Sequence, residues 1–142
     1  MIGPLSDPTK VPPSARILVV EDEIPIRKLI FDILKNEGYE LIAFPDGLET
    51  LNWLQVHPER IDLVITDIQL PGISGKELAD QICTMRPDTK ILFLSGYSSF
   101  SVNDLNPWSH THSHFLAKPF KLSDLLAHVD RLIGQKAART FS

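Results

Sequence analysis

Five short apolar segments recur along the chain, with amphipathic helical patterns between them. The segments cover residues 16–20, 40–44, 61–66, 90–95 and 114–118, at a spacing of roughly 20 to 25 residues. Strands that alternate with helices at this spacing form right-handed βαβ units, which place all the strands in one parallel sheet. The sequence therefore predicts an α/β fold: a doubly wound five-stranded parallel sheet in the order 2-1-3-4-5, with helices on both faces.

The helical patterns lie after the first, second, third and fifth strands. Apolar residues at helical spacing predict helices over residues 26–34, 47–56, 76–85 and 123–133. We expect Gly38 to end the first helix, and Asp46 and Ser123 to cap the N-termini of the second and the last. The inward-facing residues of these helices are expected to include Leu29, Leu48, Leu51, Leu78, Ile82 and Met85.

The third apolar segment, residues 61–66, runs directly into Asp67. An uninterrupted apolar and β-branched run is typical of a strand that is buried on both faces of a parallel sheet. The carboxyl edge of such a sheet is where ligands bind. Residues 70–72, Leu-Pro-Gly, force the chain to turn, so we expect the Asp67 carboxylate to be exposed and held rigidly. The alternative is that Asp67 merely ends a strand or caps a turn.

Three acidic residues, Glu21, Asp22 and Glu23, follow the first strand in the same way. In the order 2-1-3-4-5 the first and third strands are neighbours, so Glu21 and Asp22 should lie within a few ångströms of Asp67. Two carboxylates about 4 Å apart repel by about 4 kcal/mol at an effective dielectric constant of 20, so the cluster needs a cation. Oxygen ligands without histidine or thiolate favour a hard metal such as Mg²⁺.

The fourth and fifth strands end in Ser95 and Lys118. A hydroxyl, an ammonium group and a metal around one carboxylate supply what a phosphoryl group needs, namely charge neutralisation and positioning. Asp67 would then be the nucleophile of an aspartyl phosphate. Each residue alone could be a strand-end cap or a surface charge, and it is their convergence at one edge that favours a functional site.

Four motifs at these strand ends resemble the receiver domain of two-component response regulators. They are VVEDE at 19–23, ITDIQLPGISG at 65–75, FLSGY at 93–97 and FLAKPF at 115–120, and the resemblance covers about residues 16–134. It implies that Asp67 accepts a phosphoryl group from a phosphohistidine of a histidine kinase or phosphotransfer protein. It also implies a cytoplasmic signalling switch that catalyses only its own phosphorylation and dephosphorylation.

The resemblance assigns a role to each residue at these strand ends. It implies that Mg²⁺ is gathered by Glu21, Asp22, Asp67 and the backbone carbonyl of Gln69, with Asp22 binding directly and Glu21 through water. Ser95 and Lys118 would bind phosphoryl oxygens, and the peptide bond between Lys118 and Pro119 is expected to be cis.

Two further roles follow from the resemblance. Ser95 and Phe115 would form a conformational switch, in which packing selects the inward rotamer because phenylalanine lacks a phenol. Gln69 and Tyr97 would tune the lifetime of the phosphate.

The stretch between Gly96 and Phe115 departs from the family pattern. Asn103, Asn106 and Pro107 disfavour a helix, so we expect the fourth helix to be short or irregular. Dimerisation through the face formed by this helix, the fifth strand and the last helix is therefore in doubt. The alternating His110, His112 and His114 are more typical of a polar loop than of a metal site, which would need a fourth ligand.

Composition excludes several other classes of protein. The net charge of −4 and the absence of a Lys/Arg run argue against direct nucleic-acid binding. The single Cys83 excludes an internal disulfide and fits a reducing compartment. No apolar run approaches the ~20 residues of a membrane span, and the start lacks the features of a signal peptide. We therefore expect a cytoplasmic protein without membrane contact.

The expected domain limits are a Pro-rich tail or linker over 1–14, a receiver domain over 15–135 and a C-terminal tail over 136–142. The unit either stands alone or belongs to a larger protein such as a hybrid histidine kinase, and its downstream effector is not identified. Two rivals are weighed against this interpretation. A small Asp-dependent phosphatase would usually carry an acid where Gln69 stands, and a receiver used only for docking should lack acids or the lysine.

Overall fold

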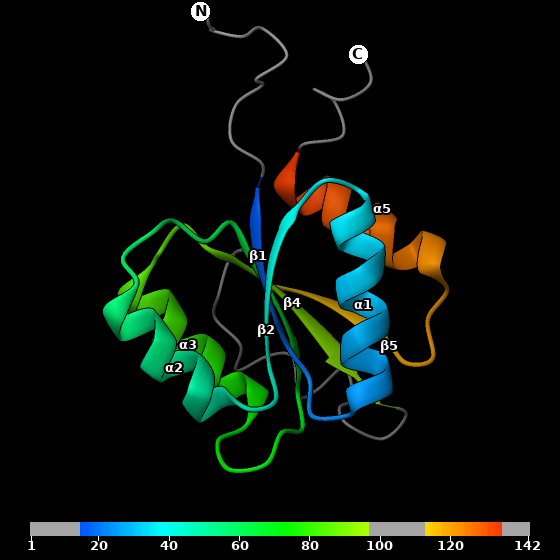
Figure 1. Cartoon of the computed structure of the whole chain (residues 1–142). Helices are drawn as coiled ribbons and strands as arrows, with labels where there is room; N and C mark the ends of the chain where they lie inside the picture. Colours follow the sequence, from blue (N-terminus) through cyan, green and yellow to red (C-terminus); the bar gives the residue numbers. More distant parts are fainter. Residues whose placement is uncertain (1–14, 97–112, 135–142) are drawn as a thin grey trace, which may run out of the picture.

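The computed structural model describes residues 15–96 and 113–134 of the chain. In chain order, the elements are β1 (Arg16–Val20), α1 (Ile24–Asn36), β2 (Glu40–Phe44), α2 (Gly47–Val56), β3 (Leu63–Asp67), α3 (Gly75–Met85), β4 (Lys90–Ser95), β5 (Ser113–Ala117) and α5 (Leu122–Ile133). All strand pairs are parallel, and the sheet order is β2-β1-β3-β4-β5. The predicted fold class and strand order are confirmed (Figure 1).

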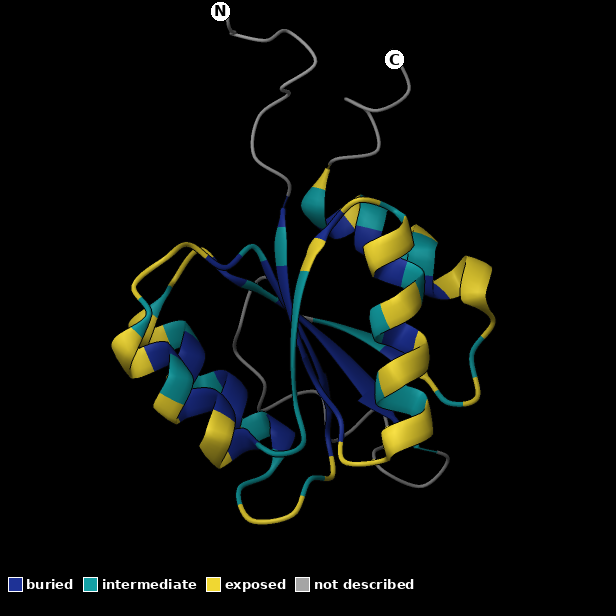
Figure 2. Ribbon diagram, viewed as in Figure 1, coloured by how far each residue is buried: buried dark blue, intermediate teal, exposed yellow. Residues whose placement is uncertain are grey.

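The sheet separates two hydrophobic clusters. Helices α2 and α3 cover one face and helices α1 and α5 the other (Figure 1). Side chains of β1 alternate between the faces, so that Ile17 and Val19 join the cluster under α1 and α5, while Leu18 and Val20 join the one under α2 and α3. The central strands β1, β3 and β4 are consequently buried on both sides (Figure 2), as the uninterrupted apolar runs predicted.

Short-range signals in the sequence set several helix ends. Gly38 has φ +97°, and its N–H donates to the Lys35 carbonyl while the N–H of Tyr39 donates to the Leu34 carbonyl. This left-handed C-terminal motif is the expected end of α1. The Asp46 carboxylate accepts the Glu49 N–H and caps α2, as predicted.

The cap assigned to the last helix was wrong. Helix α5 starts at Leu122, and its N-cap residue, Lys121, makes no side-chain capping hydrogen bond. Ser123 therefore lies inside the first turn of the helix. The Lys121 carbonyl accepts the backbone N–H groups of Asp124 and Leu125, so the first turn closes through the main chain.

Three leucine and methionine positions expected in the core are exposed. Leu29 is 45% exposed, Leu48 62% and Met85 40%. A helix on a sheet buries only the stripe that touches the strands, and in α1 that stripe is centred on Ile30 and Leu34. Leu29 lies beside this stripe, where it lines a surface pocket with Pro119 and Phe120.

The fourth helix and most of the histidine-rich stretch fall outside the described residues. The same is true of Tyr97, His110 and His112. His114 belongs to β5, where it pairs in register with Leu92 of β4. The predictions about an irregular fourth helix and about dimerisation through its face therefore stay predictions.

Candidate functional site

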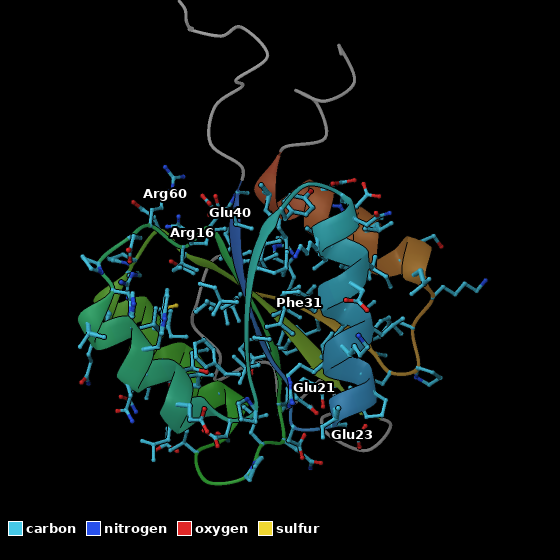
Figure 3. All side chains as sticks on the ribbon, viewed as in Figure 1. Arg16, Glu21, Glu23, Phe31, Glu40 and Arg60 are labelled. Carbon is cyan, nitrogen blue, oxygen red and sulfur yellow. The ribbon has the colours of Figure 1, made fainter. Side chains whose placement is uncertain are left out.

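The strand register brings the acidic residues of two loops together. Val20 of β1 lies opposite Thr66 of β3, so the next residues along the two strands, Glu21 and Asp67, are neighbours. One ligand oxygen from each of Glu21, Asp22 and Asp67 lies within 4.8 Å of the others. Figure 3 shows Glu21 and Glu23 just past the carboxyl end of β1, at the opposite edge of the sheet from Arg16 of β1 and Glu40 of β2. The expected convergence of the three acids is confirmed.

The burial of this cluster differs from the sequence-based expectation. Asp67 is only 7% exposed and Glu21 is fully buried, whereas Asp22 is exposed. Asp67 is the last residue of the central strand β3, between β1 and β4, and the Gln69 N–H that follows donates to its Oδ1. The carboxylate still opens to a cleft of about 530 Å³ that is lined by Asp22, Glu23, Asp67, Gln69, Leu70, Pro71, Gly96 and Lys118.

Lys118 connects the two buried carboxylates. Its Nζ lies 2.9 Å from Asp67 Oδ2 and 3.1 Å from Glu21 Oε1. Its backbone N–H donates to the Ser95 carbonyl, which ties the end of β5 to the end of β4. The peptide bond from Lys118 to Pro119 is cis, as predicted. Burial lowers the pKa of the Lys118 ammonium, but hydrogen bonds to Asp67 and Glu21 outweigh it and leave that pKa raised.

Glu21 is held in an unusual electrostatic state for a glutamate. Burial raises the pKa of Glu21 to about 7, against the lowering effect of the Glu23 N–H and of Lys118. Arg27 of α1 donates from Nη1 to the Glu21 carbonyl at 2.8 Å, which holds the loop in place. The side chain of Glu21 is therefore poised between its neutral and charged forms near neutral pH.

Ser95 ends the neighbouring strand in an equally buried position. Its side chain is fully buried, and Oγ has no hydrogen-bond partner among the described residues. Asp67 pairs in register with Leu94 of β4, so Ser95, the next residue of β4, lies one residue beyond the strand partner of Asp67. The described residues thus leave Ser95 Oγ unbonded at the carboxyl edge of the sheet.

Two more predicted site residues flank this region. The Phe115 ring stacks on Phe93 with centroids 5.1 Å apart and packs against the cluster under α2 and α3. Gln69 is exposed in the cleft, and its N–H donates to Asp67 Oδ1 at 3.3 Å. The structure thus gathers Glu21, Asp22, Asp67, Gln69, Ser95 and Lys118 around one edge of the sheet.

Comparison with known proteins agrees with this geometry. Residues 17–130 match the response regulator receiver domain family. The chain belongs to that family. Receiver domains are signalling modules of phosphorylation-dependent two-component systems, and they interact with histidine kinases or phosphotransfer proteins.

The relatives of this receiver domain include single-domain and larger proteins. It is 33% identical over 120 residues to the response regulator receiver protein CpdR of Brucella abortus, across 83% of this chain and 96% of CpdR. It is 30% identical over 123 residues to the sensor kinase CckA of the same organism, across 87% of this chain but 13% of CckA. A solved structure of TrrA from Thermotoga maritima, in complex with Mg²⁺-BeF, shares 39% identity and a TM-score of 0.71 over 83% of this chain and 98% of TrrA.

The residues of this receiver domain fit a magnesium ion. Receiver domains bind Mg²⁺ at their acidic pocket, and here the carboxylates of Glu21, Asp22 and Asp67 lie together, with Lys118 in contact with two of them. The donor set is all oxygen, and exposed Asp22 leaves room for bound water, which suits a small hard cation. None of the helices in the described parts of the chain has the length and apolar character needed to traverse a lipid bilayer.

Two residues near the site were missed by the sequence interpretation. Arg27 lies four residues after Glu23 on α1, and a helix would place it one turn above the acidic loop. Gly75 begins α3, and its N–H donates to the Ile68 carbonyl next to Asp67. The repeated glycine of the segment at 65–75 was the available signal for a close backbone approach.

Proposed function

We propose that Asp67 is the phosphoacceptor of this receiver domain. It would take a phosphoryl group from a phosphohistidine of a histidine kinase or phosphotransfer protein, with Mg²⁺, and signal through a changed partner-binding face. The contact of Lys118 Nζ with Asp67 Oδ2 carries this proposal. A carboxylate held by a lysine at the floor of a cleft, next to two further acids, is positioned for attack on phosphorus.

The other residues of the cleft have distinct roles in this proposal. Glu21, Asp22, Asp67 and the backbone carbonyl of Gln69 gather the Mg²⁺, which neutralises charge on the transferring phosphoryl group. Lys118 would pair with one phosphoryl oxygen once the Asp67 carboxylate has become an acyl phosphate. Ser95 supplies the hydroxyl for another oxygen, consistent with the lack of a partner for its Oγ among the described residues.

Signal output and timing complete the proposal. Ser95 and Phe115 form the switch. A hydrogen bond from the Ser95 hydroxyl to the phosphoryl group would move β4 relative to the Phe115 ring, which stacks on Phe93. Gln69 and Tyr97 set the lifetime of the phosphate. Residues 15–135 form the receiver unit, flanked by tails over 1–14 and 136–142, in the cytoplasm.

Acetyl phosphate with MgCl₂, followed by intact-mass measurement, tests the assignment. The wild-type chain should gain the mass of one phosphoryl group, and Asp67→Asn should gain none. Asp88→Asn removes an exposed carboxylate elsewhere on the surface and should behave as wild type. A chain that gains no phosphoryl group under these conditions would favour a docking-only receiver, and sustained turnover of a phosphate ester would favour a phosphatase.

A further inference from the structure

The loop between β3 and α3, residues 68–74, forms one wall of the cleft. Gln69, Leu70 and Pro71 all line it. The loop carries the Gln69 N–H that donates to Asp67 Oδ1. Small displacements of this loop would therefore change the geometry around the phosphoacceptor directly.

The far end of the loop is fixed against the backbone of Asp67. The N–H of Gly75 donates to the Ile68 carbonyl at 2.7 Å. A Cβ atom at position 75 would lie 2.0 Å from the Asp67 carbonyl oxygen and 2.9 Å from Ile68 Cα. These are backbone atoms, so only glycine allows α3 to begin so close to Asp67.

The loop is also held at Ile73, near its far end, by a second glycine from a different part of the sequence. Gly47 is the first residue of α2, and a Cβ there would lie 2.7 Å from Ile73 Cγ1 and 2.8 Å from Cδ1. Gly47 has an ordinary φ, so conformational freedom does not explain the glycine. The space above its Cα is filled by the Ile73 side chain.

Both partners of this contact are held by other groups, although Ile73 is only half-buried. Asp46 accepts the Glu49 N–H through its side chain and Thr50 Oγ1 through its carbonyl, which holds the start of α2. Ile73 packs against the cluster under α2 and α3, and its β-branched side chain has few χ1 rotamers. A methyl group at position 47 would therefore displace Ile73, and the loop with it.

We propose that Gly47 and Ile73 form a steric lock that sets the position of the 68–74 loop and thereby the Mg²⁺ affinity of the site. Gly47 is a positioning residue, which acts on Asp67 and Gln69 only through Ile73. This inference rests on the proposed function, because it assumes that the cleft binds Mg²⁺. Loss of a group that orients metal ligands typically costs about 10- to 100-fold in metal affinity, and an indirect displacement belongs at the lower end.

The test is a titration of the ¹⁵N-labelled 142-residue chain with MgCl₂, followed by the amide NMR shifts of Asp67 and Gln69. Gly47→Ala should raise the Kd for Mg²⁺ about tenfold and shift the loop amides before metal is added. The double variant Gly47→Ala/Ile73→Ala, which removes the clashing atoms, should recover most of the wild-type affinity and loop shifts. Gly38→Ala is the matched control, because it strains a left-handed glycine in open space far from the loop.

Each outcome decides the proposal. The lock is supported if Gly47→Ala weakens Mg²⁺ binding and the double variant restores it. The Gly38→Ala control should lower thermal stability but leave Mg²⁺ binding unchanged. The lock is overturned if Gly47→Ala binds Mg²⁺ as wild type does, since Ile73 then swings aside, or if the double variant binds no better than the single one. A wild-type chain that does not respond to Mg²⁺ refutes the metal part of the proposed function and the lock with it.

Discussion

Replacing Glu21 by glutamine should remove a large part of the pH dependence of folding stability. Glu21 is fully buried, and burial raises its pKa from 4.5 to about 7. Glutamine has nearly the shape of the protonated glutamic acid but cannot ionise. The variant therefore mimics one protonation state of the wild type at every pH.

The sign follows from proton binding by the two states. Between pH 4.5 and about 7 the folded protein holds a proton on Glu21 that the unfolded chain has released. Raising the pH through this window removes that proton from a buried group, so the free energy of unfolding falls. At 1.36 kcal/mol per unit of pKa, the shift corresponds to a loss of about 3 kcal/mol in the absence of metal.

Urea unfolding in EDTA, at about pH 5 and about pH 8, measures this loss. The free energy of unfolding of Glu21→Gln should fall less than that of the wild type over this range, by about 2 to 3 kcal/mol. Glu59→Gln, at an exposed carboxyl, is the control and should follow the wild type. Equal pH dependence in Glu21→Gln and the wild type would show that burial does not hold the proton on this residue.

Two further predictions concern stability alone. Ser95→Ala should raise the free energy of unfolding by about 1 to 3 kcal/mol, because it removes a buried hydroxyl that has no hydrogen-bond partner among the described residues; a loss of stability in urea unfolding would reveal a bonded hydroxyl. Arg86→Ala should cost about 1 to 2 kcal/mol, because Nη2 donates to the carbonyls of Leu54 and His57 at the end of α2. Thermal unfolding measures this cost, and an unchanged midpoint would contradict it.

Local patterns in the sequence were sufficient for the architecture. The apolar runs located β1, β2 and β4 with their observed bounds, and β3 and β5 to within two residues at each end. Gly38 and Asp46 signalled helix ends because their effect depends on adjacent backbone groups only. The meeting of Glu21, Asp22 and Asp67 also followed from the sequence, because strand order and register place successive strand ends side by side.

Burial at the site required the tertiary structure. Sequence spacing placed Asp67 at a strand end but could not show that its neighbours leave it only 7% exposed. The contact of Lys118 with both Glu21 and Asp67 joins residues from three strand ends. How far such a group is removed from water depends on neighbours that are remote in sequence, and this removal shifts the pKa of Glu21.

The same limit explains the misjudged helix faces and the steric lock. Periodicity predicted that Leu29, Leu48 and Met85 face the core, but which apolar residues touch the sheet depends on how each helix packs against it. Gly47 and Ile73 lie in separate segments, and the local sequence of neither segment predicts their contact. The sequence determined which helices and strands form and which reactive side chains meet at the carboxyl edge of the sheet. Close packing between distant segments decided which of those groups lose water, which pair and which are held in place, because these depend on the whole set of neighbours.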